Sequence, residues 1–212
     1  MFPWRLFLAV VTVAALVLSV QAQSAATSDF VIQGISTAFV DSPSITSNYQ
    51  KRASGGGRSA QWLEVEVTYS WSPKDKTQLM LEAYDVKFFV LIKNGAVSPN
   101  KKDTLLTGTS SHVLLTPGRD KRAVMFVSPQ QLTKLFGGGR IPPVATQVVS
   151  GVGIEIAVGG TKMAEKTDKG QGAWWSDAKT TAAFEKADGI LLDKAKTPFA
   201  PLAYDYHEPL KQ

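Results

Sequence analysis

The sequence predicts an all-β sandwich of about seven to nine antiparallel strands with one or two short helices. Short runs of β-branched and aromatic residues recur along the chain, and turns rich in glycine and proline separate them. The strands do not alternate with helices as they would in a nucleotide-binding α/β fold, and no internal repeat is visible. A single β-sandwich domain is therefore expected.

The first 22 residues are predicted to be a secretory signal peptide. One cation, Arg5, precedes the apolar run Leu6–Val20, and small residues lead to a cleavage site after Ala22. The apolar run is too short and wrongly flanked for a transmembrane anchor. We therefore expect an exported chain whose domain occupies residues 23–212, ends in a proline-rich tail, and resides in the periplasm, at the outer membrane or on the cell surface.

The first two strands are expected at Phe30–Val40 and Gln61–Trp71. In the second, apolar residues alternate with polar ones, and Glu64 and Glu66 mark the solvent-facing side. The connection Asp41–Ala60 is rich in serine and glycine and is long for a compact domain. It is therefore expected to be a mobile loop or an adaptable binding segment.

The middle of the chain supplies further strands. Asp85–Lys93 is a nearly continuous apolar run, which indicates a central strand. Two short apolar runs flank the polar stretch Gly108–Ser111 and predict a hairpin, and a strand at Arg122–Val127 follows the next turn. The two runs of the hairpin are Leu105–Thr107 and His112–Thr116.

One short helix is well signalled at Gln130–Phe136. Ser128 can cap it, and Pro129 suits the first helical position. Beyond it, the β-branched runs Val144–Val149 and Val152–Val158 form either a hairpin or one long strand with a glycine bulge.

The last third of the chain is less regular. Thr161–Gly172 is polar and rich in lysine, so a loop is expected there. A short helix is predicted within Trp174–Glu185 and a final strand at Gly189–Leu192. Prolines make the tail Thr197–Leu210 irregular.

The composition excludes several kinds of chemistry. The chain has no cysteine, which excludes disulfide scaffolds, thiol catalysis, zinc-thiolate and iron–sulfur sites, and lipid attachment at a cysteine. Its net charge of +5 is modest and its basic residues are dispersed, so nucleic acid is not expected as a partner. No Gly-x-Ser-x-Gly motif accompanies the two histidines, and Ser110, Ser111 and His112 are expected in a solvated turn.

Two sets of titratable residues are candidates for catalysis or metal binding. Glu64 and Glu66 would place their carbons about 6.5–7 Å apart on one strand face, which is compatible with glycoside hydrolysis. Alternating charges that keep a strand in water are the simpler interpretation. Asp205, His207 and Glu208 lack a second ligand group at fixed spacing. We therefore expect no catalytic residue, no metal, no cofactor and no enzymatic activity.

The tryptophan pair Trp174 and Trp175 is the candidate for partner binding. Neighbouring residues in an extended segment point to opposite sides, so one ring can enter the core while the other is exposed. An exposed tryptophan can stack on a sugar or anchor a protein interface. The alternative is that one ring packs in the core and the other covers the tail.

The C-terminal third carries a resemblance to a known family. Its residues are Gly189-Ile-Leu-Leu-Asp-Lys-Ala-Lys-Thr-Pro-Phe-Ala-Pro-Leu, then Tyr204-Asp-Tyr206, together with Trp174-Trp175 and the start at Phe30. With these residues the chain resembles exported verrucomicrobial proteins encoded with a type IV pilus-like gene cluster. The resemblance implies an immunoglobulin-like β-sandwich similar to archaeal pilus subunits, a role in pilus formation or at the outer membrane, and no catalytic residue.

One departure from pilins narrows this role. The leader lacks a short basic prepilin cleavage site, so an accessory or differently assembled subunit fits better than a major pilin. The leading hypothesis is a non-enzymatic surface protein, peripheral to the outer membrane, whose partners are proteins of a pilus-like assembly or further copies of itself.

Two alternatives stay open. The chain would otherwise be a lectin-like module that binds surface glycan through Trp174 or Trp175 and the loop Ser42–Ser59. Gln23–Val40 is either the first strand of its own domain or a strand donated to a neighbouring chain.

Overall fold

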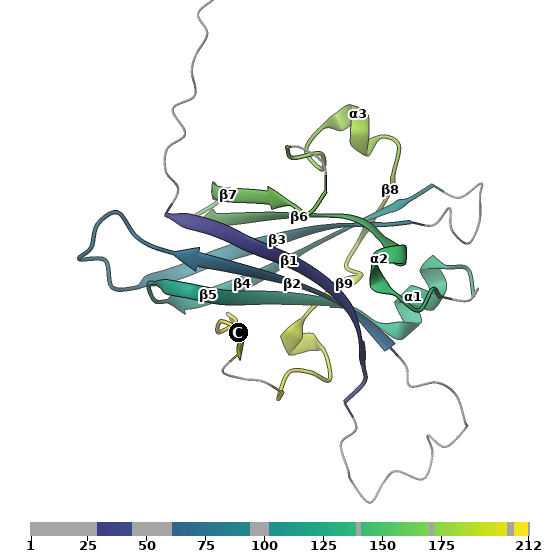
Figure 1. Ribbon diagram of the computed structural model, residues 1–212, viewed down its shortest axis with the longest axis horizontal. Helices are drawn as coiled ribbons and strands as arrows, with labels where there is room; N and C mark the ends of the chain where they lie inside the picture. Colours follow the sequence, from purple (N-terminus) through teal and green to yellow (C-terminus); the bar gives the residue numbers. More distant parts are fainter. Residues whose placement is uncertain are drawn as a thin grey trace, which may run out of the picture.

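The structure is a computed structural model that describes residues 29–43, 61–93, 102–138, 141–169, 172–202 and 206–211. These residues form two β-sheets packed face to face, which confirms the predicted sandwich (Figure 1). The predicted signal peptide and most of the loop Ser42–Ser59 lie outside the described residues. No helix within the described ranges is long and apolar enough to span a bilayer.

Nine strands are described. In order across the first sheet they are β1 (Phe30–Asp41), β2 (Gln61–Trp71), β5 (Gly118–Val127) and β9 (Leu191–Asp193). In the same order the second sheet contains β7 (Thr161–Thr167), β6 (Val149–Val158), β3 (Leu81–Ile92), β4 (Thr104–Leu115) and β8 (Glu185–Asp188). Neighbours are antiparallel except β4 and β8, which are parallel.

Four short helical segments complete the described chain. They are α1 (Pro129–Leu135), α2 (Ala145–Val148), α3 (Ala178–Thr181) and the 3-10 turn η3 (Lys194–Lys196). The predicted cap of α1 is confirmed, because the Ser128 side chain accepts a hydrogen bond from the Gln131 backbone. Figure 1 shows α1 and α2 together at one end of the sandwich.

The core lies between the sheets and follows the alternation seen in the sequence. Leu63, Val65 and Val67 of β2 are fully buried, while the residues between them are partly exposed. The hydroxyl groups of Tyr69 and Tyr84 lie 2.5 Å apart inside this core and satisfy each other. Burial raises the pKa of both tyrosines, so the pair stays neutral.

The predicted hairpin around Gly108–Ser111 is wrong, because β4 runs through it as one continuous strand. Gly108 pairs with Phe88 and faces the first sheet, where a side chain would meet Met125 at 2.7 Å and Leu191 at 2.8 Å. The glycine here permits close packing between the sheets rather than a turn.

The predicted loop Thr161–Gly172 is also wrong over its first half, which forms β7 beside β6. A short edge strand that carries several lysines looks like a loop in the sequence. It pairs with another strand on one side only, so its exposed side chains can be charged. The last strand, β9, begins later than predicted, and the polar strand β8 was not anticipated.

The β-branched segment before β6 is divided between two structures. Residues 145–148 form α2, whereas Val149–Val158 is one strand. The register shifts between Leu91 and Ile92, whose partners are Gly151 and Val149. Of the two alternatives, the single strand with a bulge is therefore correct over Val149–Val158. The strand predicted over the residues before Val149 is wrong, because they form α2.

Candidate functional site

The C-terminal segment binds the edges of both sheets. We call residues 206–211 the C-terminal strap. The backbone of Val113 in β4 donates to the Pro209 carbonyl at 3.1 Å, and Lys211 donates back to Ser111 at 2.8 Å. The backbone of Glu208 donates to the Arg122 carbonyl of β5 at 3.1 Å. The strap therefore joins the two sheets along one side of the sandwich (Figure 1).

His112 is the buried centre of this contact. It is 1% exposed, and its ring stacks on Tyr84 with centroids 5.2 Å apart. Nδ1 lies 3.2 Å from the carbonyl oxygen of Glu208, which can only accept, so Nδ1 carries the proton and donates. Nε2 then accepts from the Ser110 hydroxyl at 2.9 Å. Burial lowers the pKa of His112 to about 4, so the ring is neutral at pH 7.

A row of polar and charged side chains in contact with one another lies on the outer face of the first sheet. Glu66 accepts from Arg122 at 2.7 Å, and its second oxygen lies 3.3 Å from Nε2 of His207. Lys194 donates to Nδ1 of His207 at 3.2 Å. Burial alone would raise the pKa of Glu66, but the nearby His207 and the hydrogen bond from Arg122 outweigh it and hold that pKa below its usual range. Tyr206 covers the Arg122 guanidinium, which lies 4.4 Å from the ring centroid.

A cavity of about 280 Å³ lies between the strap and the sheets. His112 and Val124 line it from the strands, and Lys194 and His207 line it from the C-terminal part of the chain. The remaining lining residues within the described part of the chain are Ala195, Ala200, Glu208, Pro209, Leu210 and Lys211. Apolar residues and residues with polar or charged side chains contribute equally to this described lining.

Ser110, Glu64 and Glu66 have different surroundings in the structure. Ser110 is fully buried and does not line the cavity, so its contact with His112 serves packing. The two oxygens of Glu66 already face Arg122 and His207, and Glu64 has a pKa raised first by burial and then by Glu66. Within the described ranges no group of three or more acidic residues and histidines could hold a metal ion, and Asp205 lies outside those ranges.

The tryptophan pair packs on the outer face of the second sheet. Trp175 is 7% exposed, stacks on Phe89 at 5.2 Å and donates to Glu155 at 2.8 Å. Trp174 is partly exposed and donates to Thr167 at 3.0 Å. Partner binding by Trp174 and Trp175 stays a prediction, and Trp174 is the more accessible of the two.

The sheet edges are protected unequally. β8 and the strap cover β4, and β9 covers the end of β5. β7 is an exposed edge that is short and charged, with Lys162, Glu165 and Lys166 in seven residues. By contrast, β1 has twelve residues, carries no charge from Phe30 to Val40, and pairs with no described strand except β2.

Along β1 only the bulge is capped. Lys166 reaches across from β7 and donates to the carbonyls of Ile32 and Gln33 at 3.2 and 2.6 Å. Beyond the bulge, Ile35 and Phe39 are only partly buried against the core, and α2 lies beside the strand. Among the residues that the structure describes, no further strand pairs with this part of β1, and its apolar side chains are half covered.

A protein-family model matches residues 21–212, which is almost all of the chain beyond the predicted signal peptide. The chain belongs to this family. A crystal structure of a protein from Akkermansia muciniphila shares the fold with a TM-score of 0.70. The two are 19% identical, and the similarity covers 86% of this chain and 93% of that chain. No functionally curated protein matches the sequence.

Sequence reasoning did not anticipate the site beneath the strap in this family member. His112 and His207 were each considered alone, because 95 positions of the sequence separate a strand residue from a tail residue. The same is true of Glu66, which was interpreted as a solvated charge but pairs with Arg122.

Proposed function

We propose that the protein is a non-enzymatic component of the cell envelope that takes part in a pilus-like assembly and joins its neighbours through β1. The observation that carries the proposal is the edge of β1, which no other described strand than β2 covers, which has no charge from Phe30 to Val40, and which carries the half-buried side chains of Ile35 and Phe39. An extended strand from a second chain can pair with such an edge through backbone hydrogen bonds.

The contrast among the edges supports this assignment. Exposed edge strands usually carry lysines, bulges or covering segments, because an unprotected edge invites pairing. The molecule uses all three devices at β4, β5 and β7 and leaves Gly34–Val40 without them. β1 itself belongs to its own domain, since Phe30 is 3% exposed in the core and β1 pairs with β2 over its length. It would therefore accept a strand rather than be donated.

The first test asks where the native protein resides. Surface filaments are sheared from intact cells and compared by immunoblot with the periplasmic and outer-membrane fractions. Enrichment with the filaments is the expected result. Recovery in the soluble periplasm alone would exclude a role as a filament component.

The second test asks whether β1 is the joining edge. Lysines placed at the exposed positions Ser36 and Ala38 should remove the protein from the filament fraction without changing its melting temperature, because charged edges resist pairing. Thr161→Lys on the already charged strand β7 is the matched control and should leave the protein in the filaments. Equal recovery of the Ser36→Lys/Ala38→Lys variant would contradict joining through β1.

A further inference from the structure

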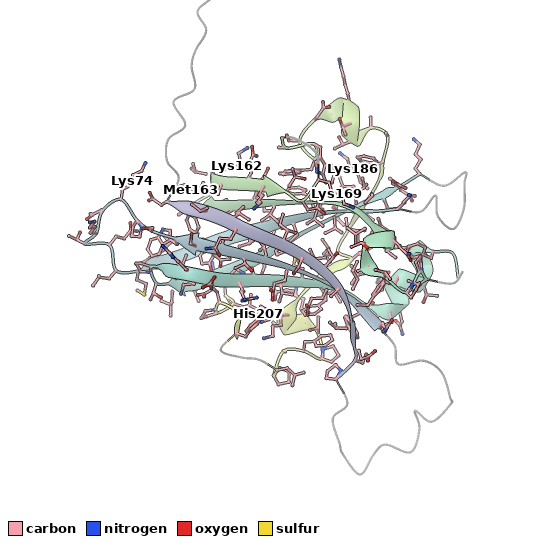
Figure 2. All side chains as sticks on the ribbon, viewed as in Figure 1. Lys74, Lys162, Met163, Lys169, Lys186 and His207 are labelled. Carbon is pink, nitrogen blue, oxygen red and sulfur yellow. The ribbon has the colours of Figure 1, made fainter. Side chains whose placement is uncertain are left out.

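The part of β1 that no strand but β2 covers, among the described residues, has a defined limit at each end. At the first end, Lys166 donates to two carbonyls of the bulge. β7 lies beside this part of β1, where Figure 2 labels Lys162 and Met163. At the other end, Asp41 is the first charged residue of the strand. Between these limits, only β2 is hydrogen-bonded to the backbone of Gly34–Val40 within the described chain.

This segment is suited to pair with a second copy of itself. Thr37 is its midpoint, and two antiparallel strands related by a two-fold axis pair symmetrically about such a residue. With the axis at Thr37, Ile35 of each copy lies opposite Phe39 of the other. Both side chains are only half buried in one copy, and pairs of an aromatic and a β-branched residue stabilise neighbouring strands. On the outer face the small residues Ser36 and Ala38 lie opposite each other.

The ends of this arrangement carry complementary charges. Asp41 of one copy lies beside the bulge of the other, at Gln33, whose carbonyl accepts from Lys166 at 2.6 Å. A carboxylate and an ammonium group therefore come together at both ends of the paired strands. Within one copy, the Asp41 carboxylate accepts a long hydrogen bond of 3.4 Å from Gln61. No like charges face each other between the ends, because Phe30–Val40 carries none.

We propose that β1 joins two copies of this chain, through antiparallel pairing of Gly34–Val40 with the same segment of the second copy about a two-fold axis at Thr37. The four-stranded first sheets of the two copies then form one continuous sheet. This inference rests on the proposed function, because it names the neighbour that β1 binds. The symmetry closes the pair, so a longer assembly adds such pairs through other surfaces.

The absence of cysteine from the chain makes the axis directly testable. A single introduced cysteine can bond to its counterpart in the second copy only near the axis, where opposite Cα atoms lie about 4.5–5.5 Å apart. The mature chain carrying Thr37→Cys, kept in a glutathione redox buffer, should therefore run mainly as a disulfide-linked dimer on non-reducing gels. Val31→Cys, on the same strand and 57% exposed, is the matched control and should stay monomeric.

A second pair of variants tests the register. Ser36→Cys and Ala38→Cys lie opposite each other across the interface, whereas each is displaced by two positions from its own counterpart. A mixture of the two should give the mixed dimer as its main product, which intact-mass spectrometry distinguishes. Either variant alone should give little dimer.

A third experiment tests the charges at the ends. The native mature chain should form a concentration-dependent dimer in sedimentation. Asp41→Lys places like charges at both ends and should raise the dissociation constant by about fivefold. Adding Lys166→Glu to this variant reverses the second charge and should recover part of the affinity.

Cross-linking at Thr37→Cys together with the mixed dimer supports self-pairing about Thr37. A native chain that stays monomeric, or a Thr37→Cys variant that links no better than Val31→Cys, would overturn it. Melting curves that match the native chain show that these variants fold.

The filament test separates this inference from the assembly role. If Ser36→Lys/Ala38→Lys leaves the filaments but Thr37→Cys does not cross-link, β1 joins a different protein and only self-pairing fails. If the lysine variant stays in the filaments while Thr37→Cys cross-links, self-pairing stands and the assembly role of β1 fails.

Discussion

Gly151 and Gly153, two residues apart on β6, have different consequences for the packing of Trp174 and Trp175. A side chain at Gly153 would lie 2.1 Å from the Trp175 ring, whereas one at Gly151 would lie 3.5 Å from Trp174. The first distance is a clash with a rigid ring and the second is ordinary contact. The absence of a side chain at Gly153 is therefore what lets Trp175 pack flat against the sheet.

This difference gives a matched pair of variants. Gly153→Ala should lower the free energy of unfolding by about 1–3 kcal/mol, because the displaced ring loses its stacking on Phe89. Gly151→Ala should be close to neutral. Denaturant unfolding of the two variants checks the prediction, and equal stability of both would show that Trp175 does not pack as described.

His112 makes stability depend on pH. Its pKa is about 4 when folded, against an ordinary value of 6.5 that also applies to the unfolded chain. As the pH falls below 6.5, His112 becomes protonated in the unfolded chain but stays neutral in the folded chain. This group should therefore reduce the free energy of unfolding progressively between pH 6.5 and 4, by about 3 kcal/mol in full.

The measurement compares denaturant unfolding from pH 7 to pH 4.5 for the native chain and for His112→Gln. Carboxylates titrate in both proteins, so the difference between the two slopes isolates the histidine. The variant should lose stability less steeply as the pH falls. Parallel slopes would mean that His112 is accessible to protons in the folded state.

At the scale of elements, the strap replaces an edge strand. It covers β4 where β8 ends, since β8 pairs with Thr104–Thr107 and the strap reaches Ser111–Val113. It also reaches β5 through Arg122. A six-residue segment without regular secondary structure thus completes the protection of two strands.

Ending the chain after Leu202 removes this protection. The shortened protein should melt at a lower temperature, because the hydrogen bonds to β4 are lost and His112 is exposed. It should also associate in a concentration-dependent way through the uncovered edge of β4, as light scattering would show. Lys211→Ala, which keeps the backbone pairing, is the control. A shortened chain that stays monomeric and equally stable would show that the strap is dispensable.

The elements also show what a sequence can predict. β2 and α1 were found because their signals are local: alternation in one case, and a serine cap with proline in the other. β7 and β8 were missed because short polar edge strands owe their structure to the neighbours they pair with. The pairing of Glu66 with Arg122 and His207 depends on strand order and on a distant tail, which no local pattern encodes.

At the scale of the whole molecule, the two sides of the sandwich differ in how they are finished. On one side the last part of the chain supplies β8, β9 and the strap, and the edges there are closed. On the other side β1 and β7 meet through Lys166, and β1 stays available beyond its bulge. The closed side holds the domain together, whereas the β1 side is the one on which the proposed joining of other chains depends.

The segments that cover β4 and β5 come last in the chain and are therefore synthesised last. Until residues 185–211 have been made, the edges of β4 and β5 have no covering segment. Unpaired strands of this kind are exposed to aggregation. A nascent chain stalled before residue 185 would carry most of the core but open edges on both sides, and it would be the form that most needs a chaperone.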